Sequence, residues 1–379
     1  MERIVDSIYY GTHFDSLKVA IMNSHQSKTI LGNDIWVKKS FEAVNHSIEQ
    51  NYTVLTSTGI STYEFLIWAT SVLCGKQIIV HPASKDEDYQ KTAEILIDDF
   101  HIDTKRTAFV FLPSKFNKKD IKKTWKARDS YIFASADRIY PVCVKDNGQI
   151  ASLLENCAGK IIVDDFRCNY QSKHYPNKEY NYESIDRKYP KEEWHYLTHW
   201  VHCTYKPWRG ESSYDFYGSI YNSKNEYSNS AKATLSNILI NNKIFATSSN
   251  IREHFEVVSF TELSPAESLS MMKWRKRKVM YNFEPFGIAL NRRYASEIGM
   301  KPAIYGDDVL YLSLSQQERA LFQAIGDRYD WRNEKEWRHV GDIDLSLIPK
   351  DMVKIIVPMA KEAEMIEEFT DFEVITLCD

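Results

Sequence analysis

Two glutamates near the C-terminal end of the sequence, Glu334 and Glu336, are separated by a single residue. Residues 335–340 are predicted to form a strand. Because side chains alternate between the faces of a strand, the two carboxylates are expected on the same side. Close carboxylates repel each other, so the pKa of one should rise, and such a pair can act as a base or stabilise a positively charged sugar. The alternative is a surface strand neutralised by Arg332, Lys335 and Arg338.

Two turns that end predicted strands form a second group in the N-terminal half. The first contains Ser57, Thr58, Gly59, Ser61 and Thr62, followed by Glu64, and the second contains Asn147 and Gly148. Backbone N–H groups at the junction between a strand and a helix bind anions, and Glu64 is suited to accept a hydrogen bond from a ribose hydroxyl. Ser61 and Glu64 also fit a helix-capping box, which is the alternative. Two such loops at the carboxyl ends of parallel strands favour a ligand site.

Basic and histidine-rich segments raise two further possibilities. Lysines from Lys115 to Lys126, with Arg128, are expected to line one helix face that contacts a phosphate backbone or is simply solvated. The run at 271–278 has the same two interpretations. His195, His199 and His202 have helical spacing, but no acidic or cysteine cluster completes a metal site, so none is predicted.

The order of the predicted elements gives the fold class. Strands are expected at 18–24, 52–56, 77–81, 107–113, 139–144 and 160–165, with helices at 36–50, 62–74 and 149–157 and a lysine-rich helix through Lys126; a polar stretch spans 84–94. This alternation predicts an α/β fold, a Rossmann-like doubly wound parallel sheet. The second half mixes helices at 230–240, 265–273 and 315–326 with strands at 255–261, 286–290, 302–305, 335–340 and 352–357, and is predicted to be an α+β domain.

Length and composition set the domain plan. With 379 residues, two domains are expected. We assign a nucleotide-binding domain to residues 1–166, a linker or wrapping segment to 167–194 and an effector domain to 195–379. The net charge of −4 excludes a generally basic nucleic-acid coat but not a local patch. The six cysteines lack a C-x-x-C pair, and the sequence shows neither a signal pattern nor a membrane-spanning run, so a reduced, cytoplasmic protein is expected.

The N-terminal half resembles the SLOG superfamily of Rossmann-like domains, which includes the DNA-processing protein A domain and the Lonely Guy phosphoribohydrolases. The resemblance is carried by VAIMNS, TSTGISTYE and ARDSYIFASADRIYPVCVKDNGQIASLL, over residues 15–165. It implies ligand contacts from Asn23 and Ser24, from the two turns, and from Arg128 to a phosphate or base. The second glycine motif of the phosphoribohydrolases is replaced by KDNGQIASLLE, so the resemblance favours binding or sensing.

The C-terminal half resembles bacterial domains ending in E-x-E-W-R that often lie near phage-defence genes, and through them ADP-ribosyltransferases. The resemblance rests on FTE, EPFGIALNR, KPAIYGD and EKEWR, over residues 195–345. It implies NAD as the cofactor, with His199 holding the nicotinamide ribose, Ser259 or Thr261 bracing the pocket and Glu336 catalytic, and it places Glu334 in the same site.

These expectations combine into one leading hypothesis. A SLOG-like domain binds a nucleotide-derived ligand, and the C-terminal domain is the effector of an antiviral-defence protein, an NAD-dependent ADP-ribosyltransferase. The alternatives are a non-catalytic protein that binds single-stranded nucleic acid through Lys115–Arg128, and a nucleotide base–sugar hydrolase that uses Glu64 or Glu155. The oligomeric state is open, a homo-oligomer included, and no membrane partner is expected.

Overall fold

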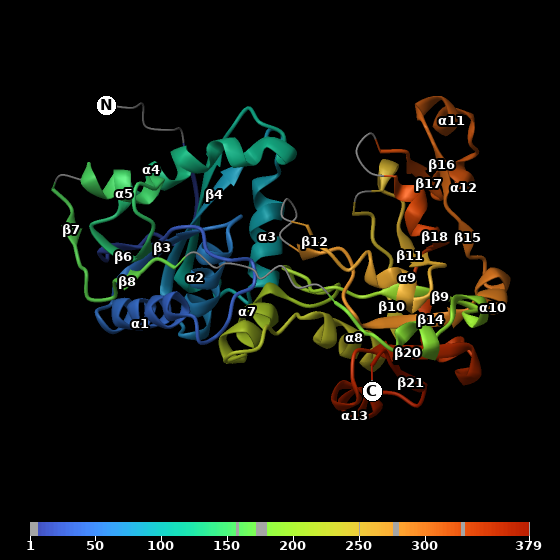
Figure 1. The fold of residues 1–379 in the computed structure, drawn as a ribbon. Coiled ribbons are helices and arrows are strands. Elements are labelled where there is room, and N and C mark those ends of the chain that lie inside the picture. The colour runs from blue at the N-terminus through green and yellow to red at the C-terminus, as the bar shows by residue number, and fades with distance from the viewer. Residues whose placement is uncertain are drawn as a thin grey trace. The chain divides into compact units, whose positions relative to one another are not determined.

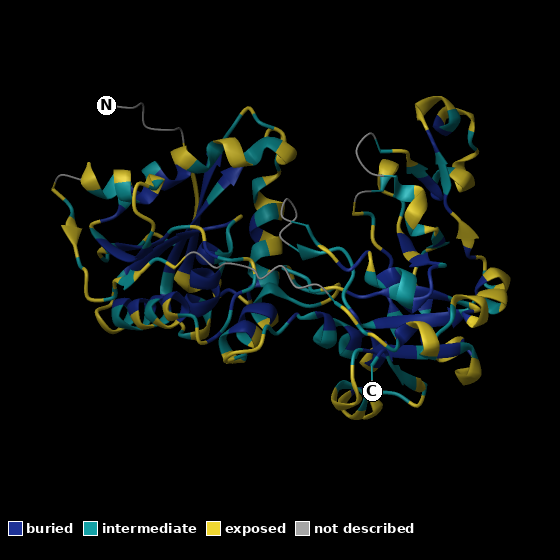
Figure 2. Cartoon of the chain, viewed as in Figure 1, coloured by how far each residue is buried: buried dark blue, intermediate teal, exposed yellow. Residues whose placement is uncertain are grey.

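The computed structural model describes residues 7–156, 159–171, 180–249, 251–275, 280–326 and 330–378 (Figure 1). The chain divides into two compact units, the first made of Met1–His174 and Tyr205–Ser228 and the second of Tyr175–Thr204 and Asn229–Asp379. The strands of both sheets are mostly buried, and exposed residues concentrate on helices and loops (Figure 2). Among the described residues, no helix combines the length and apolarity needed to cross a bilayer.

The first unit is built on a sheet whose central strands are all parallel. These strands are β2 (Lys18–Asn23), β3 (Thr53–Ser57), β4 (Lys76–Ala83), β5 (Thr107–Pro113) and β6 (Arg138–Val144). Three short strands complete the sheet: β1 (Ile8–Gly11), antiparallel to β5, and β7 (Ile161–Ile162) and β8 (Cys168–Asn169), both parallel to β6. The spatial order is β1-β5-β4-β3-β2-β6-β7. Near-continuous apolar runs, such as residues 107–112, form these strands because both faces are covered.

Helices cover both faces of this sheet. They are α1 (Ile35–Glu49), α2 (Ser61–Val72), α3 (Tyr89–Asp99), α4 (Trp125–Ser135), α5 (Gln149–Glu155) and α7 (Ser213–Asn222). In Figure 1, α1 and α2 lie on one side of the strands and α4 and α5 on the other. The predicted Rossmann-like α/β class is confirmed. The lysine-rich helix predicted through Lys126 is a 3₁₀ helix, Lys118–Thr124, followed directly by α4. The polar stretch 84–94, for which no element was predicted, contains the start of α3.

The strand order changes direction between β2 and β6. From β2 the chain adds β3, β4 and β5 on one side, and then returns to place β6 on the other side of β2. In open α/β sheets this switch point leaves a crevice beyond the carboxyl ends of the two strands, and ligands bind there. The residues after β2 and β6 are therefore the ones that the topology places at a candidate site.

The second half of the chain returns a helix to the first unit. α7 buries Phe216, Tyr217 and Ile220 in the same core cluster as Phe65 and Trp68 of α2. The expected start of a second domain at residue 195 therefore does not describe Tyr205–Ser228. The aromatic residues of α2 are therefore buried by apolar residues of α7, which lies far away in the sequence.

The second unit contains a largely antiparallel sheet in the order β15-β18-β11-β9-β14-β20-β21. Its strands are β9 (Tyr196–Trp200), β11 (Val257–Thr261), β14 (Gly287–Asn291), β15 (Lys301–Pro302), β18 (Glu336–Val340), β20 (Val353–Val357) and β21 (Glu373–Thr376). Ile288 and Leu290 pack in one core cluster and Ala289 in another, because neighbouring residues of a strand face opposite sides.

Short elements surround this sheet. The helices are α6 (Ile185–Lys188), α8 (Ala231–Ile240), α9 (Pro265–Leu269), α10 (Arg292–Glu297), α11 (Asp308–Ser313), α12 (Gln316–Arg319) and α13 (Ala360–Glu367). The two-stranded pairs are β10 (Lys243–Ile244) with β19 (Ile343–Asp344), β12 (Trp274–Arg275) with β13 (Met280–Tyr281), and β16 (Ile304–Gly306) with β17 (Phe322–Ala324). The predicted helix 315–326 is wrong, since only α12 is helical and β17 follows it.

Candidate functional site

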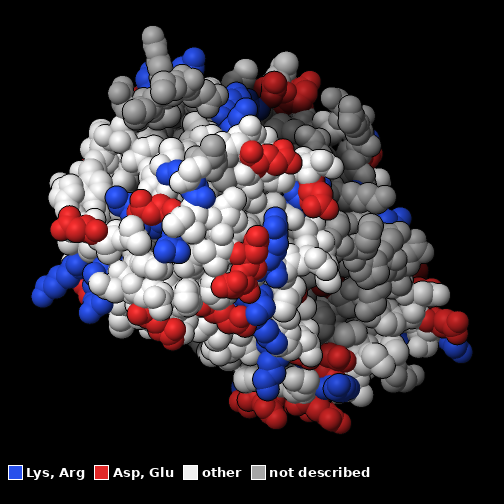
Figure 3. Space-filling model, turned by 90° about the vertical axis from the view of Figure 1, so that its left-hand side faces the viewer, with Lys and Arg blue, Asp and Glu red and all other residues white. Residues whose placement is uncertain are grey.

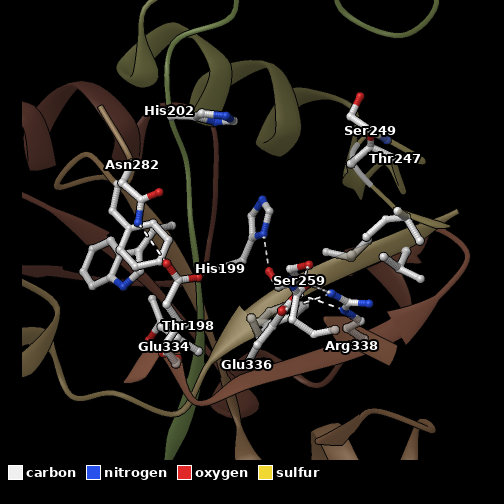
Figure 4. Close-up of a pocket in the computed structure, with 18 of the residues that line it drawn as sticks. Thr198, His199, His202, Thr247, Ser249, Ser259, Asn282, Glu334, Glu336 and Arg338 are labelled. Carbon is white, nitrogen blue, oxygen red and sulfur yellow. Dashed lines mark hydrogen bonds and ion pairs between the residues drawn. The ribbon is translucent and has the colours of Figure 1, made fainter. Parts of the chain in front are cut away.

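A pocket of about 440 Å³ opens beside three adjacent strands of the second unit, β9, β11 and β18. His199 comes from β9, Ser259 from β11 and Glu336 from the start of β18, and all three line the pocket (Figure 4). Five aromatic residues also line it: Trp200, Phe245, Phe260, Phe283 and Trp331. The structure thus brings together residues that are separated by 60 positions, from His199 to Ser259, and by a further 77, from Ser259 to Glu336.

His199 is held in one orientation by the backbone of the neighbouring strand. Its Nδ1 lies 2.9 Å from the carbonyl oxygen of Ser259. A carbonyl can only accept a hydrogen bond, so Nδ1 carries the proton and Nε2 of the neutral ring is left as an acceptor. Burial lowers the pKa of His199 and outweighs this hydrogen bond, which acts to raise it. Because its pKa is lowered from the usual value of 6.5, the ring is neutral at pH 7. A neutral imidazole so oriented accepts a hydrogen bond from a ligand hydroxyl.

Glu336 is anchored by a serine and a buried arginine. Ser259 Oγ donates to Glu336 Oε1 at 2.7 Å, and Arg338 Nε and Nη2 donate to Oε1 and Oε2 at 2.9 and 3.1 Å. Arg338 is 1% exposed, and its remaining N–H groups are used by the carbonyls of Ala320 and Phe322 and by Gln323. This bidentate pairing fixes the orientation of the carboxylate.

Glu334 reaches the same pocket by a different route from the one predicted. It lies in the 3₁₀ turn Trp331–Glu334, outside β18, and Lys335 between the two glutamates is left-handed, with φ 43°. Strand alternation therefore does not explain why both glutamates line the pocket. Asn282 Nδ2 donates to Glu334 Oε1 at 3.3 Å, and Thr261 Oγ1 donates to the Glu334 carbonyl, which secures the turn.

The first unit has a pocket of about 400 Å³ at its switch point. Asn23, Ser24 and His25 after β2 line it, as do Lys145 and Gly148 after β6. Ser24 ties the two strand ends together, because its N–H donates to the Cys143 carbonyl and its hydroxyl accepts from the Lys145 N–H. The other residues that line this pocket are Ile60, Tyr63, Trp125, Asp129, Gln149, Ile150 and Tyr170. Asn23, Ser24 and Gly148 are thus the predicted residues that meet here.

Most of the predicted first turn is occupied with internal contacts. Ser57 Oγ donates to the Val80 carbonyl, and Thr58 Oγ1 lies 2.8 Å from His81 Nδ1. The Gly59 N–H donates to Glu64 Oε1 at 2.9 Å, and Tyr217 donates to Glu64 Oε2 at 2.8 Å. Ser61 and Thr62 belong to α2, and Thr62 is buried. None of these six predicted residues lines the switch-point pocket. The Gly59 N–H, which was expected to bind a ligand, donates to the Glu64 carboxylate instead.

Arg128 is buried rather than directed at a ligand. It is 0% exposed, and it donates to Asp129 Oδ1 at 3.0 Å and to the Thr58 carbonyl at 3.1 Å. Its guanidinium carbon lies 4.7 Å from the centre of the Tyr63 ring and 5.4 Å from that of the Trp125 ring. Burial raises the pKa of Asp129, and Arg128 and Tyr63 act in the opposite direction. The expected contact of Arg128 with a phosphate is therefore replaced by a structural role for the Arg128–Asp129 pair.

Sequence reasoning missed several residues of this pocket. Gln149 Nε2 donates to Asp129 Oδ2 at 3.0 Å, which links the helix after β6 to α4. Asn147, which was predicted, is exposed, has φ 56° and lies outside the pocket, while its neighbours Lys145 and Gly148 line it. The strand order could have indicated these residues, because residues directly after β2 and β6 lie where the order changes direction and ligands bind at that point.

The lysine-rich segment shows local pairing rather than one continuous basic face. Lys123 pairs with Asp120 at 2.8 Å, and Lys122 lies 5.5 Å from the centre of the Trp125 ring. On the face drawn in Figure 3, basic and acidic side chains lie beside one another. These contacts are typical of a solvated surface, the alternative named for this segment.

A carboxylate in the first unit makes a prediction about pH. Glu87 Oε1 lies 2.8 Å from His81 Nε2, and Glu87 Oε2 accepts from the N–H and hydroxyl of Ser84. Burial opposes ionisation, but these hydrogen bonds outweigh it and lower the pKa of Glu87 to about 2. Its stabilising contribution is therefore complete above the unfolded pKa near 4.5 and is lost as the pH falls towards 2.

We expect Glu87→Gln to reduce the free energy of unfolding at pH 7 by about 2 kcal/mol, a figure discounted for partial exposure. The difference from the wild type should shrink between pH 4.5 and pH 2, as measured by denaturant unfolding. Glu42→Gln, at an exposed i,i+3 pair with Lys39, is the control and should change little. A difference that is the same at pH 7 and pH 3 would contradict this account.

Solved structures that resemble part of this chain include two DNA processing proteins. DNA processing protein A from Helicobacter pylori, whose structure was described for its single-stranded DNA binding mode, is 16% identical, with a TM-score of 0.33, over 44% of this chain and 74% of that chain. DNA processing protein A from Streptococcus pneumoniae is 18% identical, with a TM-score of 0.32, over 41% of this chain and about half, 53%, of that chain. No family model and no curated protein matches the sequence.

Proposed function

We propose that the second unit is an ADP-ribosyltransferase that takes NAD as its substrate. One observation carries the proposal: His199, Ser259 and Glu336, from three adjacent strands, line a single pocket with aromatic walls. The order of the three side-chain types along the chain, histidine, hydroxyl and late glutamate, is the one that the resemblance to this superfamily implies. The neutral Nε2 of His199 accepts from a ribose hydroxyl, and the aromatic walls offer faces to the nicotinamide ring.

The chemistry needs a fixed negative charge next to the sugar. When the bond between nicotinamide and ribose C1′ breaks, its electron pair leaves with nicotinamide and positive charge builds on the ribose. Glu336 is held by Ser259 and Arg338 before any ligand arrives, so it stabilises that charge without reorganising. Glu334, on the same pocket, is placed to take the proton of the attacking nucleophile.

The test is release of nicotinamide and transfer of label from NAD carrying a labelled adenylate. The full-length protein is incubated with labelled NAD and with nucleic acid or protein acceptors, and the products are separated by mass. Label in an acceptor from the wild type and none from Glu336→Gln supports the proposal. Nicotinamide release without labelled acceptor identifies a glycohydrolase instead, and no release by wild-type protein that binds NAD overturns the proposal.

We also propose that the switch-point pocket of the first unit binds a nucleotide-derived ligand, and that this binding controls the effector in antiviral defence. A specific observation favours the site: Asn23 lines the pocket and is 5% exposed, its Nδ2 donates to Ser40, and its buried Oδ1 has no hydrogen-bond partner among the described residues. A buried polar atom without a partner is costly, and a ligand donor would satisfy it. Trp125 adds an aromatic surface and Lys145 adds a cation for phosphate.

We expect Lys145→Glu to weaken the binding of a nucleoside phosphate by about tenfold or more, because a charge-assisted hydrogen bond is replaced by repulsion. Calorimetry with nucleoside mono- and diphosphates measures the affinity. Lys126→Glu is the matched control, since Lys126 is exposed and lies outside the pocket. Equal affinities for the two variants, in a wild type that binds, would move the ligand away from this site.

The two alternatives from the sequence have less structural support. A base–sugar hydrolase would use Glu64 or Glu155. Glu64 is bound to Gly59 and Tyr217, Glu155 is exposed at the end of α5, and neither lines the switch-point pocket. A nucleic-acid site along Lys115–Arg128 would lack Arg128, which is buried.

A further inference from the structure

A second hollow of the second unit has four cations among its ten lining residues. It has a volume of about 590 Å³, and we call it the basic groove; its charged lining residues are Lys273, Arg275, Arg332, Lys335 and Glu267. Ser270 and Asn333 add polar groups to the same lining. The basic run continues in the sequence with Lys276, Arg277 and Lys278, which lie outside the described residues.

The cations of the groove exceed the carboxylates that pair with them. Among the described lining residues, Glu267 is the one carboxylate, and it pairs with Lys191 at 3.0 Å and Lys335 at 3.6 Å. Arg332 pairs with Asp330 at 2.7 Å, and this pair is largely exposed, so water and salt weaken it. Among the described residues, and with Arg275 left out of the comparison, the four cations Lys191, Lys273, Arg332 and Lys335 lie beside the two carboxylates Glu267 and Asp330, in a protein whose overall charge is −4. The excess positive charge is therefore local.

The groove and the candidate active site share one wall. The backbone of Lys335 is left-handed, so Lys335 lines the groove while its neighbours Glu334 and Glu336 line the pocket. The turn is fixed on both sides, because the Lys335 N–H donates to the Arg332 carbonyl and the Glu262 N–H donates to the Lys335 carbonyl. A polymer bound in the groove would thus pass within one residue of both carboxylates.

We propose that the basic groove binds the phosphate backbone of a nucleic-acid strand and that this strand is the acceptor of ADP-ribose; the second part rests on the function proposed above. Guanidinium forks match phosphate oxygens, and repeated phosphates neutralise several cations at once. In the transfer, an oxygen or nitrogen of the strand forms a bond to ribose C1′, nicotinamide leaves with the electron pair of the broken bond, and the displaced proton passes to Glu334.

The binding half is tested without NAD, so its result stands whether or not transfer is observed. Full-length protein is titrated into a fluorescent single-stranded oligonucleotide of mixed sequence, and anisotropy is followed at several salt concentrations. Lys273→Glu/Lys335→Glu should weaken binding by about tenfold or more and reduce the slope of log affinity against log salt by about 1.4. Lys122→Glu/Lys123→Glu makes the same charge change in the first unit and should bind as the wild type does.

Three results would overturn the inference: no binding by the wild type at low salt, loss of binding only in the Lys122→Glu/Lys123→Glu protein, or competition by polyaspartate as effective as that by unlabelled oligonucleotide. The last result would assign the groove to an acidic polypeptide. If the oligonucleotide binds through the groove but receives no label from NAD, the binding half stands and the acceptor half fails. The transferase function itself fails only if the wild type also releases no nicotinamide and labels no protein acceptor.

Discussion

Replacing Arg338 by Met is expected to lower the free energy of unfolding by about 3–5 kcal/mol, because it leaves the Glu336 carboxylate without its buried partner. The Ala320 and Phe322 carbonyls and the Gln323 side chain lose their donor at the same time. Denaturant unfolding monitored by tryptophan fluorescence measures the change. Arg332→Met is the matched control: its pair with Asp330 is exposed and should contribute less than about 1 kcal/mol.

The double variant Arg338→Met/Glu336→Gln separates the cost of the unpaired charge from the cost of lost packing. Since it removes both charges, it should recover part of the stability lost in the single variant. If the double variant is no more stable than Arg338→Met, or if Arg332→Met costs as much as Arg338→Met, the buried pair is not the source of the effect.

Glu336→Gln is expected to reduce the rate of nicotinamide release by about 10²–10³-fold, which is the size of effect seen when one electrostatic stabiliser is removed from an active site. The amide keeps the shape of the side chain and can still accept from Ser259, so NAD binding should change much less than the rate. Single-turnover rates and calorimetric affinity for NAD measure the two quantities separately.

Two comparisons control this measurement. Glu334→Gln removes the neighbouring carboxylate of the same pocket, and it should slow transfer to an acceptor more than hydrolysis of NAD, if Glu334 takes the proton of the nucleophile. Glu253→Gln, at an exposed pair with Arg319 outside the pocket, should leave both reactions unchanged. A Glu336→Gln protein that is folded and retains the full rate would remove the carboxylate from the mechanism.

The parallel sheet of the first unit could be predicted because its strands carry their signal locally. Residues 107–113 were expected and found as β5, since an apolar run bounded by polar residues needs no tertiary context to be recognised. The helix predicted at 315–326 failed for the opposite reason. Helical spacing continues past Arg319, but Phe322 is buried against Tyr311 and its segment pairs with β16 as a short strand. Tertiary packing overrides local preference there.

The candidate sites were predicted to different depths. The types and order of His199, Ser259 and Glu336 could be read from the sequence, but their meeting depends on β9, β11 and β18 lying side by side, which periodicity does not encode. Arg128 shows the limit in the other direction. Its place in a family-like motif suggested a ligand contact, whereas the folded chain buries it next to the rings of Tyr63 and Trp125. Burial decides between these roles, and burial belongs to the folded chain.

The return of α7 to the first unit means that the backbone passes between the two units three times. A fragment truncated after residue 166 or 174 would therefore lack α7, which packs on Phe65 and Trp68. It would expose an apolar surface that is prone to self-association. A clean separation of the units requires a spliced gene in which a short loop joins the first segment directly to Tyr205–Ser228.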